Sequence, residues 1–186
     1  QQPQAIVFDF DYTLADSSTP VTACVNYALR TMGLPEAAPQ AVHRLIGYDL
    51  YHTFDVLAGE QANGRGDEFL RLFLERAELI MVVGTVILEP TSSALQELSS
   101  RSKLGILSSK NRVHIEAVLR RERLLGCFHA IVGGTDVPNL KPHPEGLDKV
   151  LDSLGATPEG SVYVGDSLVD AEAAQRAGVD FVAVLF

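Results

Sequence analysis

The 186-residue chain contains no tryptophan and only two cysteines, Cys24 and Cys127, which lie far apart among apolar neighbours. Such a pair favours buried free thiols over a disulfide framework. No run of 18 apolar residues is present, so nothing predicts a membrane-spanning helix. The first residues, Gln-Gln-Pro-Gln, have neither the basic nor the apolar region of a signal peptide. These absences predict a cytoplasmic protein that does not associate with a membrane.

Positive charge is also scarce, because 15 Lys and Arg residues face 24 Asp and Glu residues and the net charge is −9. This balance argues against nucleic acid as a partner. An anionic substrate would need a metal ion and a well-placed lysine at its site, since the overall field repels it. Hydrophobic residues make up 46% of the chain, enough for a buried core.

A short apolar run, residues 5–8, ends in two acids spaced one residue apart, Asp9 and Asp11. The run is typical of a strand buried on both faces of a parallel sheet, and open α/β sheets bind ligands at the carboxyl ends of such strands. The two carboxylates could therefore flank a divalent cation and a phosphate, and the Thr13 hydroxyl could lock the turn. The alternative is a strand followed by ordinary turn acids.

The rest of the chain predicts an α/β fold with an inserted helical segment. Residues 17–83 show helical spacing of apolar residues and need no strand, whereas later residues alternate between helices and strands. The expected strands are 5–8, 104–108, 128–132, 161–165 and 181–185. They predict a three-layer, Rossmann-like parallel sheet of five strands. Residues 1–16 and 84–186 would form the core domain and residues 17–83 an α-helical cap inserted after the first strand.

Polar residues recur just beyond the predicted strands or in the loops that follow them. They are Ser108, Lys141, Asp166 and Asp170, in addition to the acids after the first strand. Each has an ordinary alternative taken alone: Ser108 and Asp166 as helix caps, and Lys141 as a solvated surface charge.

Together these residues resemble the four motifs of the haloacid dehalogenase (HAD) superfamily, in the expected order along nearly the whole chain. The motifs are Asp9-Phe10-Asp11-Tyr12-Thr13, Ser108, Lys141 in Lys-Pro-His-Pro, and Gly165-Asp166-Ser167-Leu168-Val169-Asp170. The last two resemble the phosphoglycolate phosphatase and β-phosphoglucomutase group. Tyr12 departs from the pattern, because the family most often has glycine there. Its side chain is expected to pack against the helical insert; the alternative is that its hydroxyl lines the substrate entrance.

The resemblance implies a Mg²⁺-dependent phosphoric monoester hydrolase. Asp9 would be the nucleophile that forms an aspartyl-phosphate, and Asp11 the general acid and then the general base. Ser108 and Lys141 would bind the phosphate. Mg²⁺ would be held by Asp9, the Asp11 carbonyl and Asp166, with Asp170 and Thr13 orienting the site from behind these ligands.

Substrate choice would belong to the cap, where Arg44, Tyr48 and His52 flank a turn at Ile46-Gly47. Arg44 and His52 could equally form a solvated face. The expected partner is a small phosphorylated metabolite, bound by a monomer or homodimer. A phosphomutase of the β-phosphoglucomutase type remains the alternative, since it would use the same core residues.

Overall fold

The computed structural model describes residues 2–185. The chain divides into two compact units. One runs up to Asp16 and resumes at Ile87, and the second comprises Ser17–Val86. The predicted insert, residues 17–83, lies within the second unit.

The first unit is built on a five-stranded parallel sheet with the order β5-β4-β1-β6-β7. The strands are β1 (Ala5–Phe8), β4 (Lys103–Leu107), β5 (Ala130–Val132), β6 (Ser161–Gly165) and β7 (Asp180–Ala183). All four residues of the central strand β1 are buried. The predicted α/β class and five-stranded parallel sheet are confirmed.

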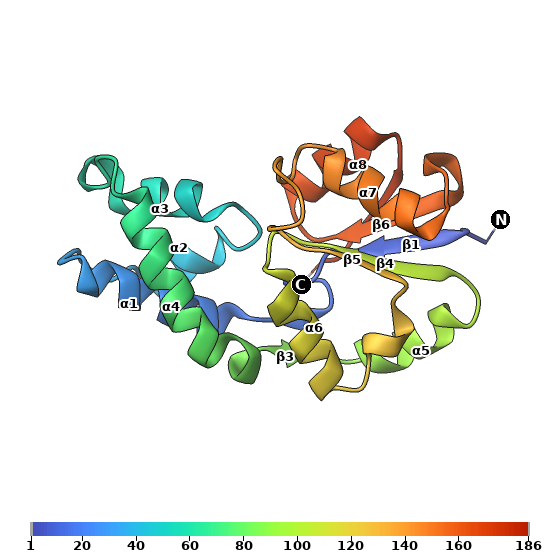
Figure 1. Cartoon of the computed structure of the whole chain (residues 1–186), viewed down its shortest axis with the longest axis horizontal. Coiled ribbons are helices and arrows are strands. Elements are labelled where there is room, and N and C mark those ends of the chain that lie inside the picture. Colours follow the sequence, from blue (N-terminus) through green and yellow to red (C-terminus); the bar gives the residue numbers. More distant parts are fainter. Residues whose placement is uncertain (1, 186) are drawn as a thin grey trace. The chain divides into compact units, whose positions relative to one another are not determined.

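Helices cover both faces of this sheet, giving three layers (Figure 1). They are α5 (Thr91–Ser99), α6 (Arg112–Arg121), α7 (Glu145–Leu154) and α8 (Leu168–Ala177), with short 3-10 turns at Leu125–Cys127 and Pro158–Gly160. Helices α7 and α8 lie on one face and α5 and α6 on the other. Alternate residues of β1 serve the two layers: Ala5 and Val7 pack with the apolar side chains of α7.

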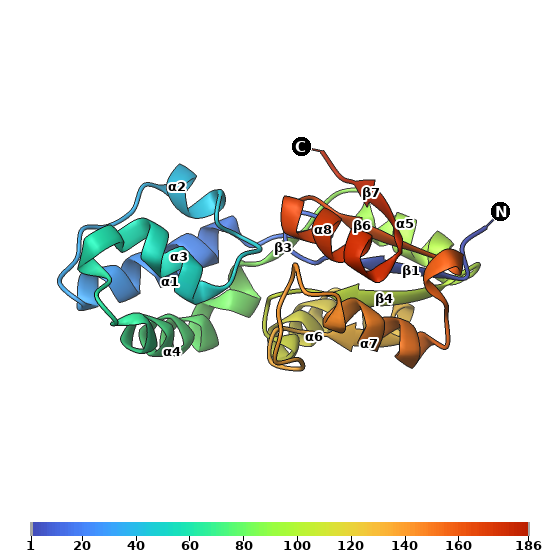
Figure 2. The same ribbon diagram turned by 90° about the horizontal axis from the view of Figure 1, so that it is seen from above.

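The second unit contains four α-helices with their own apolar core. They are α1 (Ser18–Thr31), α2 (Pro39–His43), α3 (Leu50–Ala58) and α4 (Gly66–Gly84), with a 3-10 turn at Gly59–Gln61. Figure 2 shows them from above. The core includes stacked rings of Phe54 and Phe69, with centroids 4.6 Å apart, beside Phe73. Among the described residues, no helix of either unit is both long and apolar enough to cross a bilayer.

The chain leaves and re-enters the first unit at adjacent points. Two very short strands, β2 (Ala15–Asp16) and β3 (Val86–Ile87), form a two-stranded sheet there. Next to them, the Leu88 backbone N–H donates to the Leu14 carbonyl oxygen at 3.0 Å. The sequence did not predict this pair, because strands of two residues carry no periodic signal.

Candidate active site

The order of the strands brings the predicted residues to one edge of the sheet. Because β1 lies between β4 and β6, residues Asp9, Ser108 and Asp166 follow three adjacent parallel strands. Lys141 comes from the loop between β5 and α7, and its Nζ atom lies 2.9 Å from Asp9 Oδ1 and 2.6 Å from Asp170 Oδ1. The third and fourth motifs therefore meet the first at a single buried point.

Asp9 and Lys141 form a buried ion pair whose side chains are 3% and 2% exposed. Burial raises the pKa of Asp9 to about 7, against the opposing pull of Lys141. Burial also acts to lower the pKa of Lys141, but Asp9 and Asp170 outweigh it and the pKa is raised. Lys141 therefore remains an ammonium group that can face an anion.

Asp170 is fully buried, and both of its carboxylate oxygens accept hydrogen bonds. Oδ1 accepts from Lys141 and from the Tyr163 hydroxyl (2.8 Å), and Oδ2 accepts from the Ser167 N–H (3.1 Å) and hydroxyl. Burial alone would raise the pKa of Asp170, but Lys141 and these hydrogen bonds lower it. The carboxylate thus anchors Lys141 in its ionised form.

The same residues begin helix α8, because Ser167 and Asp170 form a capping box. Ser167 is the N-cap, so the alternative in which Asp166 caps this helix is wrong. Tyr163, on β6, also lies 3.2 Å from the Leu107 carbonyl oxygen and 3.3 Å from Lys141 Nζ. Neither Tyr163 nor Ser167 was predicted as a residue of the site, although Ser167 followed by Asp170 fits the capping-box spacing.

Carboxylate oxygens of Asp9, Asp166 and Asp170 lie within 4.8 Å of one another and could hold a cation. The occupied oxygens of Asp170 leave Asp9 and Asp166 as the available ligands. Asp9 Oδ1 is buried without a hydrogen-bond partner; its 2.9 Å approach to Lys141 is an ion pair without hydrogen-bond geometry. An unsatisfied buried carboxylate oxygen beside a second carboxylate is a donor set that suits Mg²⁺.

Asp166 is held by Thr13, whose hydroxyl donates to Asp166 Oδ1 at 3.2 Å. Burial, with the nearby charge of Asp170, raises the pKa of Asp166 to about 6. Both residues predicted to orient the site make the expected kind of contact. Thr13 contacts the predicted metal ligand Asp166, and Asp170 contacts the predicted phosphate-binding residue Lys141.

Asp11 faces a different cation, because both of its carboxylate oxygens contact Lys110 Nζ, at 3.1 and 3.0 Å. The turn that carries Asp11 is closed by N–H groups of Leu14 and Ala15, which donate to the Phe10 carbonyl. Tyr12 has a φ of +58°, a region that glycine adopts without cost. This conformation accounts for the usual glycine at that position of the motif.

Ser108 is buried at the end of β4, and its hydroxyl accepts a hydrogen bond from the Lys110 N–H at 3.3 Å. The alternative of Ser108 as a helix cap is wrong, because Asn111 caps α6 through its side chain and the Val113 N–H.

The predicted cap residues lie in the helical unit. Arg44 and His52 are exposed, and the rings of Tyr48 and His52 stack with centroids 5.0 Å apart. Their role in substrate recognition stays a prediction.

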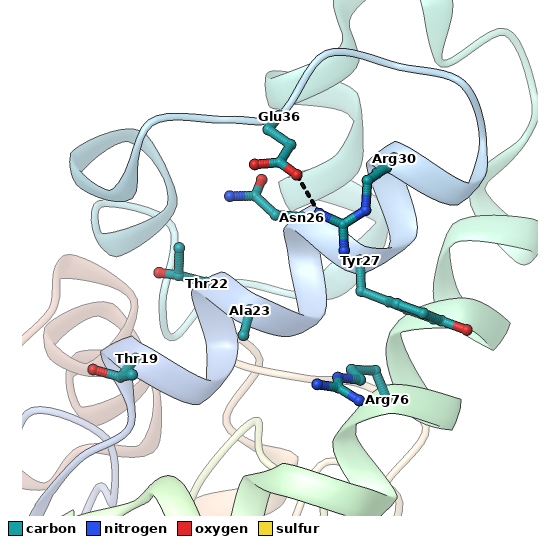
Figure 3. A pocket seen from close by; sticks show the side chains of 8 residues that line it. All are labelled: Thr19, Thr22, Ala23, Asn26, Tyr27, Arg30, Glu36 and Arg76. Carbon is teal, nitrogen blue, oxygen red and sulfur yellow. Dashed lines mark hydrogen bonds and ion pairs between the residues drawn. The ribbon is translucent and has the colours of Figure 1, made fainter.

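A separate cavity of about 500 Å³ lies within the helical unit (Figure 3). Its wall carries an ion pair of Arg30 with Glu36, and the Arg76 guanidinium lies 5.8 Å from the Tyr27 ring centroid. None of the motif residues lines this cavity, so it is not the candidate active site.

Comparisons with known proteins identify the family of the chain. The model of the haloacid dehalogenase-like hydrolase family matches residues 6–184. A phosphoglycolate phosphatase of Salmonella paratyphi A is 31% identical over 212 residues, covering 100% of this chain and 82% of the relative. One of Aquifex aeolicus is 31% identical over 176 residues, covering 94% and 81%.

A solved structure from Bacteroides fragilis, assigned to the haloacid dehalogenase-like hydrolases, superimposes with a TM-score of 0.93. It is 36% identical and covers 98% of this chain and 87% of that one. The predicted activity class, a phosphatase that hydrolyses phosphoric monoesters, is confirmed by these comparisons. The chain belongs to the haloacid dehalogenase-like hydrolases.

Proposed function

We propose that this protein is a Mg²⁺-dependent phosphatase that hydrolyses a small phosphorylated metabolite through an aspartyl-phosphate on Asp9. The observation that carries the proposal is the state of Asp9: a buried carboxylate at the end of β1, paired with Lys141 and retaining an oxygen without a hydrogen-bond partner. A nucleophile needs an oxygen that no hydrogen bond occupies, and a phosphate needs a neighbouring cation such as Lys141.

In the first step, an Asp9 oxygen bonds to phosphorus as the bond to the leaving oxygen breaks, and Asp11 gives that oxygen a proton. In the second step, water attacks the phosphorus as Asp11 takes a proton from it. The bond between phosphorus and Asp9 breaks, which releases phosphate and restores the carboxylate. Lys141 and Ser108 hold the phosphoryl oxygens. Bound Mg²⁺, held by Asp9, the Asp11 carbonyl and Asp166, would neutralise part of the phosphate charge.

The proposed substrate is phosphoglycolate or a phosphorylated small acid like it, because curated relatives at about 30% identity carry that name. A phosphomutase would use the same core residues, but these named relatives favour transfer to water. The helical unit, residues 17–83 in our prediction, is proposed to select the substrate.

Asp9→Asn tests the proposal, because it removes the nucleophile's charge with little change in volume. We expect no measurable phosphate release from phosphoglycolate, other phosphorylated acids or an aryl phosphate, together with an unchanged circular dichroism spectrum and melting temperature. Acid-quenched wild-type protein should carry a phosphoryl group detectable by mass spectrometry, and Asp9→Asn should not.

The matched control is Asp180→Asn, which changes an exposed aspartate of β7 in the same unit and should leave turnover intact. Substantial turnover by folded Asp9→Asn protein would exclude Asp9 as the nucleophile. Full activity of the wild-type protein in EDTA would exclude the metal.

A further inference from the structure

Lys110 makes a buried contact that the proposed reaction has not yet used. Its ammonium nitrogen lies between the two carboxylate oxygens of Asp11, and the two side chains are 5% and 11% exposed. Surface ion pairs are loose and contribute little, but this one is withdrawn from water. It therefore restricts the orientation of both side chains.

The backbone of Lys110 is held by two hydrogen bonds. Its N–H donates to the Ser108 hydroxyl, and its carbonyl oxygen accepts from the Gly134 N–H at 2.9 Å. The loop at Gly133 passes so close that a Cβ atom there would lie 2.7 Å from the Lys110 carbonyl oxygen. The backbone of Lys110 is thus fastened both to the end of β4 and to the loop after β5.

The Asp11 carboxylate has more freedom without this contact, because the terminal torsion of an aspartate side chain has broad energy wells. One ammonium group bridging both oxygens sets the plane of the carboxylate and the direction of its remaining lone pairs.

We propose that Lys110 is a positioning residue for Asp11 and orients its carboxylate to take the proton of the water that attacks the aspartyl-phosphate. The inference rests on the proposed function, since it assigns Lys110 to the second step of that reaction. As the water oxygen bonds to phosphorus, the bond between phosphorus and Asp9 breaks and the water proton passes to Asp11. The two lysines then have different partners. Lys141 pairs with Asp9 and Asp170, whereas Lys110 pairs with Asp11 and orients it.

Lys110→Met tests the inference, because it keeps the length of the side chain and removes the ammonium group. We expect kcat to fall at least about tenfold, within the 10²–10⁴-fold that general acid–base catalysis contributes. KM should fall with it and kcat/KM should change little, because formation of the phosphoenzyme precedes the slowed step. An aryl phosphate should give a burst of phenol, and the phosphoenzyme should accumulate.

Two further variants separate positioning from a structural role. Lys110→Arg keeps a cation that can bridge two carboxylate oxygens and should restore most of kcat. Lys149→Met removes an exposed lysine of the same unit that donates to the Asp136 carbonyl, and should behave as wild type. If Lys110→Met does not fold, Lys110→Gln takes its place with the same expected burst.

The double variant Asp11→Asn/Lys110→Met should be no slower than Asp11→Asn alone, because Lys110 acts through Asp11. An additional loss in the double variant, or a fall of kcat/KM in parallel with kcat, would overturn the inference and indicate a direct contact with substrate. If Asp11→Asn turns over normally, the proposed function fails. If Asp11→Asn is slow but Lys110→Met resembles wild type, only the role of Lys110 fails.

Discussion

In the proposed reaction, the carboxyl group of Asp9 loses its proton when a divalent cation binds. Its pKa is raised to about 7 by burial, and that of Asp166 to about 6. Divalent cations bind ionised carboxylates and displace their protons. Mg²⁺ affinity should therefore be highest above pH 7 and fall as the pH drops through these two values. Between pH 8 and pH 6 we expect about a 20-fold loss of Mg²⁺ affinity by titration calorimetry, about tenfold from Asp9 and about twofold from Asp166.

Asp9→Asn supplies the control for this pH dependence. It removes the transition near pH 7 and should leave a decline centred near the pKa of Asp166, about 6. An affinity that is constant from pH 8 to pH 6 in the wild-type protein would contradict the raised pKa of Asp9.

Tyr163→Phe removes a fully buried hydroxyl that bonds to Asp170 Oδ1 and lies near the Leu107 carbonyl and Lys141. Because its partners would be left with fewer hydrogen bonds, we expect a loss of about 1–3 kcal/mol in the free energy of unfolding. Urea denaturation measures it. Tyr51→Phe is the control, since the Tyr51 hydroxyl bonds to Asp67 at the surface and its loss should cost much less. Equal losses in both variants would contradict a special role for the buried hydroxyl.

Single residues also show where sequence reasoning stops. Asp9, Lys141 and Asp166 follow from motif order and from the edge of the sheet at which parallel strands end. The pairing of Asp11 with Lys110 does not, because 99 residues separate them and only the packed fold brings them together. Tyr163 is similarly hidden, since a tyrosine in an apolar strand predicts burial but not the carboxylate that its hydroxyl meets.

At the level of elements, the junction of β6 with α8 leaves no room for a side chain. A Cβ atom at Gly165 would lie 2.7 Å from the Cβ and Cγ atoms of Asp170. Gly165→Ala should therefore displace the start of α8, with a cost of about 1–3 kcal/mol in the free energy of unfolding. Lys141 loses its anchor at the same time, so phosphatase activity should fall more than stability alone explains.

The matched change is Gly126→Ala, in the 3-10 turn Leu125–Cys127, where a Cβ atom would meet nothing within 4 Å. Its effect on stability should stay within about 0.5 kcal/mol. Unaltered stability and activity in Gly165→Ala would contradict this prediction, because they would show that the start of α8 can shift without displacing Lys141.

The elements themselves were largely predictable, for a physical reason. Buried parallel strands need continuous apolar runs, and these runs mark β1, β4 and β6 in the sequence. Strand β5 begins at Ala130, two residues later than the predicted start at 128, although the His129 N–H already donates to the Leu104 carbonyl of β4. A difference of this size is usual at the end of a strand. Strands β2 and β3 depend entirely on each other and were not foreseen.

At the level of the whole molecule, the helical unit is proposed to choose the substrate, because the residues proposed to act in the core would contact only the phosphate. Arg44→Ala and His52→Ala should lower kcat/KM for the physiological substrate at least about tenfold, and barely change it for a small aryl phosphate. Steady-state kinetics on both substrates would measure the difference.

Arg120→Ala offers a control for the loss of an exposed arginine, because Arg120 lies on α6 of the other unit. Equal losses on both substrates would point to damaged folding of the helical unit. Unchanged kinetics on both substrates would show that Arg44 and His52 are solvent-exposed residues without a role in substrate recognition.

The hydrogen bond from the Leu88 N–H to the Leu14 carbonyl joins the two places where the chain departs from the core unit and returns to it. An insertion whose ends already meet can be lengthened, shortened or exchanged without moving the strands that carry the chemistry. The core can thus stay fixed in evolution while the inserted helices are replaced wholesale. Under the proposed division of roles, exchange of the inserted helices would give access to new substrates while the phosphate-binding residues of the core stay the same.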